Sequence, residues 1–170
     1  MLMNYILIGF MGCGKSSIGR FMSQKGYKLI DTDSYIEEKE HRSVRSIFDT
    51  DGEEYFRNLE TAAIAELAER NEDGYVIAVG GGLPMREENR RYMHEIGTVV
   101  YLRATVDTLE NRLKGDESRP LLKGGNIRDR IQKLMLERAD TYEKTADIAV
   151  DTDGRSYEDV YKLIKENTPK

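Results

Sequence analysis

The sequence has very little cysteine, histidine and proline and no tryptophan. Its 170 residues include one cysteine, two histidines and three prolines. A single thiol, Cys13, excludes an intrachain disulfide and a cysteine metal cluster, and this fits a reducing compartment. We therefore expect a cytoplasmic protein whose chemistry is carried by other side chains.

A long apolar run and an excess of positive charge are also absent. The apolar opening Tyr5–Phe10 is too short to span a membrane. The net charge of -5 disfavours nonspecific attraction to nucleic acid or to an anionic membrane surface. We expect neither as a partner, and an anionic ligand would need a local cationic pocket.

The overall composition is that of a single globular domain. Hydrophobic residues make up 39% and charged residues 34% of the chain, which excludes disorder and fibrous repeats. A chain of this length can bury roughly two-thirds of its unfolded surface around one core. We therefore predict one domain over residues 1–170 and expect a monomer.

Short runs of β-branched and aliphatic residues alternate with stretches of helical periodicity. The short runs predict five strands, at Tyr5–Ile8, Tyr27–Ile30, Tyr75–Val79, Thr98–Leu102 and Asp147–Val150. The periodic stretches predict helices at Ser16–Gln24, Glu53–Arg70, Glu87–Glu95, Val106–Lys114, Ile127–Glu143 and Tyr157–Glu166. Strands separated by helices need right-handed crossovers, so we predict an α/β fold with a five-stranded parallel sheet in a three-layer α/β/α sandwich. Ligands of such sheets bind at the carboxyl ends of the strands.

A glycine-rich segment follows the first predicted strand directly. Gly9–Ser16 fits the pattern G-x-x-x-x-G-K-[ST], and a predicted helix begins at once. The backbone amides of such a loop and the following helix N-terminus bind phosphate oxygens. Lys15 would contact the β- and γ-phosphates, and the Ser16 hydroxyl would bind Mg²⁺. A glycine turn that only caps a helix is the alternative, but a chance match has a probability of about one per cent.

The remaining motifs resemble those of one kinase family. The Asn-Lys-x-Asp signature of GTPases is missing, and the length leaves no room for a motor core, so a small-molecule kinase is favoured. The chain resembles the shikimate kinases over nearly its whole length through six motifs in the same order: Gly9–Ser16, Asp31-Thr32-Asp33, Phe56-Arg57-x-x-Glu60, Gly80-Gly81-Gly82, Arg119-Pro120-Leu121-Leu122 and Arg138-x-x-x-Tyr142. This resemblance implies a P-loop fold like that of nucleoside-monophosphate kinases, with an acceptor-binding segment at about residues 33–61 and a lid at about 113–125.

The resemblance implies a set of nucleotide and metal ligands. Residues of the glycine-rich loop and three arginines would bind ATP, namely Gly12, Cys13, Gly14, Lys15, Ser16, Ser17, Arg112, Arg119 and Arg155. Ser16 and Asp31 would hold Mg²⁺, Asp31 through a water molecule. Arg119 would swing in with the lid and stabilise the phosphoryl group during transfer.

The resemblance also implies how the acceptor, shikimate, is bound. Asp33 would bind its hydroxyls and orient or deprotonate the attacking one, so that Lys15, Asp33 and Arg119 are the catalytic residues. Arg57 and Arg138 would bind its carboxylate. Glu60 would hold Arg57 in place, and the backbone of Gly80–Gly82 would lie beside its ring.

Several of these residues have a structural alternative. Asp31 and Asp33 could cap a helix, since Ser34-x-x-Glu37 fits a capping box. Arg57 could belong to a solvated ladder of ion pairs along its own helix, and Arg138 could be an exposed helix charge. Arg119 could be an ordinary turn residue.

The reaction implied by the resemblance is ATP + shikimate → ADP + shikimate 3-phosphate, a step toward chorismate and the aromatic amino acids. A gluconate kinase of the same fold would share the nucleotide loop, but the combination of Arg57, Gly80–Gly82 and Arg138 argues against it. A regulatory module that holds ATP without turnover is a second alternative.

Overall fold

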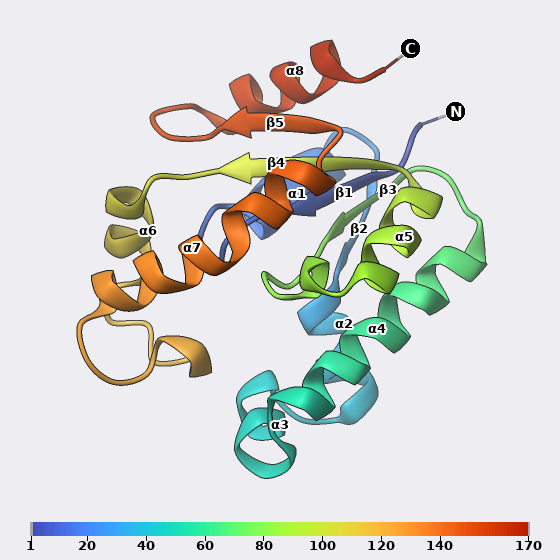
Figure 1. Cartoon of the computed structure of the whole chain (residues 1–170). Helices are drawn as coiled ribbons and strands as arrows, with labels where there is room; N and C mark the ends of the chain where they lie inside the picture. The colour runs from blue at the N-terminus through green and yellow to red at the C-terminus, as the bar shows by residue number, and fades with distance from the viewer. Residues whose placement is uncertain (1, 170) are drawn as a thin grey trace.

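The computed structural model describes residues 2–169, and a parallel sheet of five strands lies at their centre (Figure 1). The strands are β1 (Tyr5–Ile8), β2 (Lys28–Asp31), β3 (Tyr75–Ala78), β4 (Thr98–Arg103) and β5 (Ile148–Asp151). Their order across the sheet is β2-β3-β1-β4-β5, and every neighbouring pair is parallel. The five predicted strands are confirmed to within one residue at each end.

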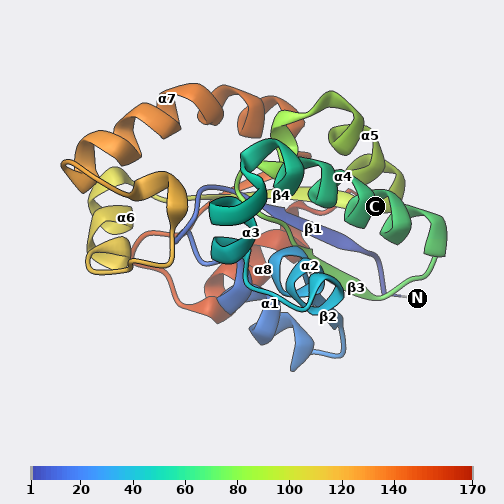
Figure 2. The same cartoon turned by 90° about the horizontal axis from the view of Figure 1, so that it is seen from below.

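Helices cover both faces of the sheet (Figure 2). One face carries α1 (Lys15–Ser23) and α8 (Tyr157–Asn167), and the other carries α4 (Glu53–Arg70), α5 (Glu87–Ile96) and α7 (Ile127–Thr145). The helix α6 (Val106–Leu113) packs against α7. The predicted three-layer α/β/α sandwich and all six predicted helices are therefore confirmed.

Two helices and two short turns were not predicted. The helices are α2 (Thr32–Glu40) and α3 (Val44–Asp51), which pack on α4 within the proposed acceptor-binding segment. The turns are 3-10 helices, η1 (Leu83–Met85) after β3 and η2 (Pro120–Leu122) inside the proposed lid. The segment Gly115–Gly125 is thus not a loop throughout.

The burial of β1 explains why its sequence is apolar at every position. Tyr5, Ile6, Leu7 and Ile8 are each 0% exposed because β1 lies between β3 and β4 and is covered by helices on both sides. A strand buried on both faces shows a continuous apolar run instead of an alternating one. The run ends at Gly9, so the loop that follows leaves the sheet at its carboxyl edge.

The lengths and compositions of the helices show whether any of them could span a membrane. None of the helices that the structure describes combines the length and the apolar character needed to cross a bilayer.

Candidate active site

The glycine-rich loop between β1 and α1 wraps around a cavity of about 380 Å³. Gly12 and Gly14 have φ angles of 81° and 105°, which favour glycine, and α1 begins immediately after Gly14. Every residue predicted to bind ATP lines this cavity: Gly12, Cys13, Gly14, Lys15, Ser16, Ser17, Arg112, Arg119 and Arg155. The structure therefore brings the predicted nucleotide ligands together from four separate parts of the chain.

Two cations donate hydrogen bonds to backbone carbonyl oxygens of the loop. The Lys15 ammonium donates hydrogen bonds to the carbonyl oxygens of Gly9, at 2.7 Å, and Phe10, at 3.0 Å. Arg112, on α6, donates from Nη1 to the Gly12 carbonyl at 3.0 Å. Both cations thus lie against the loop, and both line the cavity.

Ser16 and Asp31 lie side by side at the carboxyl edge of the sheet. The Ser16 hydroxyl donates to Asp31 Oδ2 at 2.6 Å, and Asp31 Oδ1 accepts from the amides of Asp33 and Ser34 and so caps α2. The capping alternative is thus correct for Asp31, although the carboxylate also faces Ser16. The capping box at Ser34-x-x-Glu37 is wrong, because α2 already begins at Thr32 and Glu37 Oε2 accepts from the Val44 amide.

The oxygen atoms of Ser16 and Asp31 fit a magnesium ion. Mg²⁺ prefers oxygen ligands in an octahedral shell and usually takes only one or two from protein, the others being water and phosphate. Among residues 2–169 no cluster of three or more His, Cys, Asp or Glu side chains is arranged to hold a metal. The donor set therefore suits an ion that arrives with a nucleotide better than a resident metal centre.

A second pocket adjoins the nucleotide cavity. Its wall includes Val44, Phe48 and Phe56 and all the residues predicted to bind the acceptor: Asp33, Arg57, Glu60, Gly80, Gly81, Gly82 and Arg138. Both cavities are lined by Met11, Asp33, Gly80, Gly81 and Arg119. Since the two spaces share these walls, molecules bound in the two cavities would lie next to each other.

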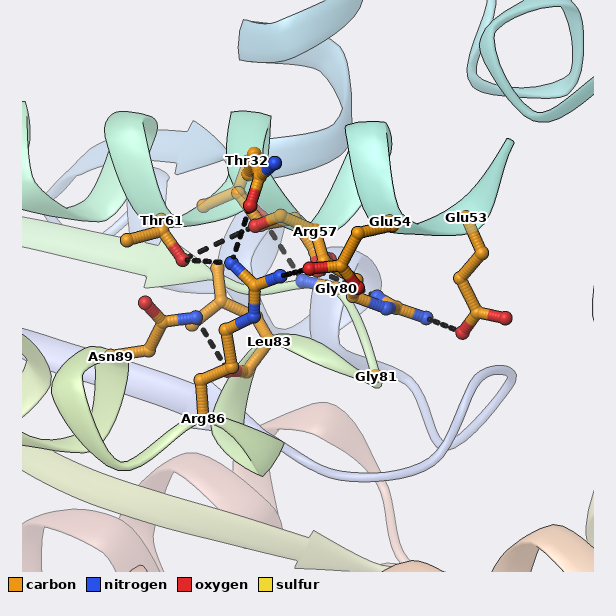
Figure 3. A network of polar contacts seen from close by, with 12 residues as sticks. Thr32, Glu53, Glu54, Arg57, Thr61, Gly80, Gly81, Leu83, Arg86 and Asn89 are labelled. Carbon is orange, nitrogen blue, oxygen red and sulfur yellow. Dashed lines mark hydrogen bonds and ion pairs between the residues drawn. The ribbon is translucent and has the colours of Figure 1, made fainter. Parts of the chain in front are cut away.

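Arg57 reaches this pocket from α4 with its guanidinium held on two sides (Figure 3). Its Nη1 donates to Glu60 Oε2 at 2.6 Å and its Nη2 to Glu53 Oε1 at 3.2 Å. A Cβ atom on Gly82 would lie only 2.4 Å from Arg57 Nη1, so glycine is needed there for the guanidinium to fit. The ion-pair ladder does exist, but only its Arg57–Glu60 pair is buried, because the Glu60 side chain is 1% exposed whereas that of Glu53 is 52% exposed.

Arg138 enters the pocket from α7 and is buried. Only 6% of the residue is exposed, so the exposed-charge alternative is wrong. Its Nη1 lies 3.3 Å from the point where a Cβ on Gly81 would stand. Arg57 and Arg138 therefore approach the same glycine triplet from helices on separate parts of the chain.

Unpaired polar atoms concentrate in this pocket. Within the described residues, four buried side-chain nitrogen or oxygen atoms have no hydrogen-bond partner, and three of them are Asp33 Oδ1, Glu60 Oε1 and Arg138 Nη1. Buried polar atoms in proteins are nearly always paired. Two free acceptors and one free donor around one space fit a ligand that carries both hydroxyl groups and an anionic group.

Burial shifts the two carboxyl groups of the pocket. Burial raises the pKa of Asp33, and the Asp31 carboxylate adds to this, whereas Lys15 and Arg119 lower it. Burial likewise raises the pKa of Glu60 to about 7, against the opposing effect of the Arg57 guanidinium. A carboxyl group whose pKa lies near neutrality can exchange protons under working conditions.

The buried carboxyl of Glu60 predicts a pH dependence of stability. Its folded pKa of about 7 lies above the ordinary value of 4.5, so the folded state binds this proton more tightly than the unfolded state does. The stabilisation that this proton gives the folded state is complete below the ordinary pKa of 4.5. It is lost as pH rises through the folded-state pKa of about 7. Urea unfolding across this window should show the wild-type free energy of unfolding falling relative to that of Glu60→Gln, which cannot ionise. Parallel profiles would show that Glu60 keeps its ordinary pKa.

The proposed lid places Arg119 between the two cavities. Its Nε donates to Asp116 Oδ2 at 3.4 Å, and its side chain is 39% exposed. Arg119 is thus exposed as the turn alternative expects, but it also lines both cavities. Arg155 follows β5 and lines the nucleotide cavity beside Thr152.

Sequence reasoning missed the side chains that tie the glycine triplet to the helices around it. Arg86, after η1, donates to Asn58, Thr61 and Glu54 on α4, at 2.9, 3.2 and 2.7 Å (Figure 3). An arginine four residues after the triplet carries no local signal of this contact. The contact fixes the turn after the triplet to the helix that carries Arg57.

Comparisons with known proteins agree on one family. The family model for shikimate kinase matches residues 11–168. The shikimate kinase of Geobacter sulfurreducens is 42% identical and covers 95% of this chain and 88% of its own, and that of Persephonella marina is 40% identical with 96% and 95% covered. A solved shikimate kinase from Acinetobacter baumannii in complex with shikimate has a TM-score of 0.92 at 31% identity, covering 100% and 97%. A gluconokinase from Sinorhizobium meliloti has a TM-score of 0.55 at 16% identity, a likeness of fold alone.

Proposed function

The chain belongs to the shikimate kinase family, and we propose that it transfers the γ-phosphoryl group of ATP to the 3-hydroxyl of shikimate, giving shikimate 3-phosphate and ADP. One observation carries the proposal for this chain. The nucleotide cavity and the pocket with the free polar atoms share Asp33 and Arg119, so donor and acceptor would meet in line across them.

The nucleotide side of the site would work by positioning and charge. The amides of the loop and the Lys15 ammonium would bind the β- and γ-phosphates, and Arg112 and Arg155 would flank the base. Ser16 and Asp31 would hold Mg²⁺, which neutralises charge on the phosphates when bound.

The acceptor side of the site would bind a ring that carries one carboxylate and several hydroxyls. Arg57 and Arg138 would bind the carboxylate, and Glu60 would hold the Arg57 guanidinium at the required angle. Asp33 would accept a hydrogen bond from the attacking hydroxyl and receive its proton as the bond to phosphorus forms. Arg119 would then stabilise the equatorial oxygens of the transferring group.

The assembly and location of the enzyme also belong to the proposal. We propose a monomer that works in the cytoplasm with small molecules, since both cavities are lined by this one chain. Its net charge of -5 gives no support to a nucleic-acid or membrane partner.

The acceptor is tested by an assay of ADP release with magnesium, using shikimate, quinate, gluconate and nucleoside monophosphates in parallel. We expect turnover with shikimate at least about a hundredfold above that with gluconate, because gluconate lacks a ring to fill the wall of Val44, Phe48 and Phe56. Turnover with gluconate alone would favour a gluconate kinase. Binding of ATP without turnover for any acceptor would favour a regulatory module.

A further inference from the structure

The glycine triplet lies close to four charged side chains of the acceptor pocket, namely Asp33, Arg57, Glu60 and Arg138. A Cβ atom on Gly80 would lie 2.6 Å from Glu60 Oε1 and 3.0 Å from Asp33 Oδ1. Gly81 faces Arg138 in the same way, and Gly82 faces Arg57. Since glycine has no side chain to restrict its backbone, some other contact must fix the orientation of these peptide planes.

One such contact comes from Thr32, the first residue of α2. Its Oγ1 accepts a hydrogen bond from the Gly80 amide at 3.0 Å, and the residue is 0% exposed (Figure 3). Thr32 stands between Asp31 and Asp33 in the chain. The bond therefore ties the beginning of the triplet to the segment that carries the proposed metal ligand and the proposed base.

A second side-chain contact comes from Tyr142 on α7. Its hydroxyl donates to the Gly81 carbonyl at 2.5 Å, and the residue is 0% exposed. Burial raises the pKa of Tyr142, so the hydroxyl keeps its proton and stays a donor at every working pH. Tyr142 lies one helical turn after Arg138, and the same turn of α7 therefore places both the guanidinium and the anchor of Gly81.

We propose that the hydroxyls of Thr32 and Tyr142 are positioning groups. They keep the peptide planes of the glycine triplet correctly oriented relative to the side chains of Asp33, Arg57 and Arg138. The inference rests on the proposed function. The Thr32 bond fixes the peptide plane before Gly80, and the Tyr142 bond fixes the plane after Gly81. Fixing the plane after Gly81 also fixes the direction of the Gly82 amide, because the carbonyl and amide of one peptide unit point in opposite directions.

The variants Thr32→Val and Tyr142→Phe remove each hydroxyl and keep nearly the whole side-chain volume. Each leaves one partly buried backbone group of the triplet without its hydrogen-bond partner, and this favours rotation of the peptide plane. We expect the KM for shikimate to rise about tenfold in each variant, while the KM for ATP changes by less than about twofold. Thr32→Ser, which keeps the hydroxyl, should restore the wild-type KM for shikimate.

Two control variants separate this effect from a general loss of packing. Tyr101→Phe removes a hydroxyl from a buried tyrosine on β4. The centroid of its ring lies 5.2 Å from the ring centroid of Tyr142. Thr145→Val removes a buried hydroxyl on α7 that bonds only within its own helix, to the Thr141 carbonyl. Thermal unfolding of all five variants shows how much stability each change costs. Both controls should leave the KM for shikimate within about twofold of wild type.

The outcomes distinguish this inference from the proposed function. A wild-type enzyme without shikimate turnover would overturn both. A wild-type enzyme with turnover, combined with Thr32→Val and Tyr142→Phe variants that lose thermal stability but keep the KM for shikimate, would overturn the positioning role alone. A raised KM for shikimate in the two hydroxyl-deleting variants, with the serine variant and both controls near wild type, supports it.

Discussion

Replacing Arg119 by alanine is expected to lower kcat about a thousandfold at saturating ATP and shikimate. Arg119 belongs to the proposed lid and lines both cavities, and its contact with Asp116 is a half-exposed pair three residues apart. Such a pair is weak, so the guanidinium is free to move onto the transferring phosphoryl group. The loss should fall mainly on kcat, because the negative charge that Arg119 neutralises develops on the phosphoryl oxygens in the transition state. Coupled ADP release under steady-state conditions measures both parameters.

The control for this variant is an arginine that lies away from both cavities. Arg91 is exposed on α5, so Arg91→Ala makes the same change of charge and should leave kcat within about twofold of wild type. Arg119→Lys should recover part of the rate, since it restores the charge without the planar fork. If Arg119→Ala kept more than a tenth of the wild-type kcat, the stabilisation would have to come from Lys15 and the loop amides.

The sheet was predictable because its signals are local. A parallel strand buried on both faces is apolar at every position, and Tyr5–Ile8 shows this directly in the sequence. The helix α2 was missed because no local signal separates it from the strand before it. It follows β2 without a loop, and its cap is Asp31, the last residue of that strand.

The residues of the site were predictable from motifs, but their environment was not. Arg57, Glu60 and Arg138 look like ordinary helix charges in the sequence, and only the packing of α4 and α7 around the glycine triplet shows that they are buried. The hydrogen bond that Thr32 accepts from Gly80 and the one that Tyr142 donates to Gly81 span 48 and 61 positions of the chain. No pattern of neighbouring residues reports a contact between positions so far apart.

Replacing Asp33 by asparagine is expected to lower kcat by about a hundredfold to ten-thousandfold. Asp33 Oδ1 is buried without a partner among the described residues, and the carboxyl lines both cavities, as Lys15 lines the first and Arg119 lines both. Asparagine keeps the volume and one acceptor oxygen but cannot take up a proton. Asp140→Asn, a change of the same type at an exposed position on α7, is the matched control and should keep the wild-type kcat.

The size of the loss separates the two roles open to Asp33. A carboxylate that only orients the hydroxyl should be replaced by the amide oxygen with a loss of less than about tenfold, whereas a base should give the full effect. Because burial raises the pKa of Asp33, a base would also show wild-type kcat/KM falling as pH drops through that raised pKa, and the fall should be absent from the residual activity of Asp33→Asn. A small loss together with an unchanged acid limb would leave Asp33 as an orienting group, with the proton leaving only after phosphoryl transfer.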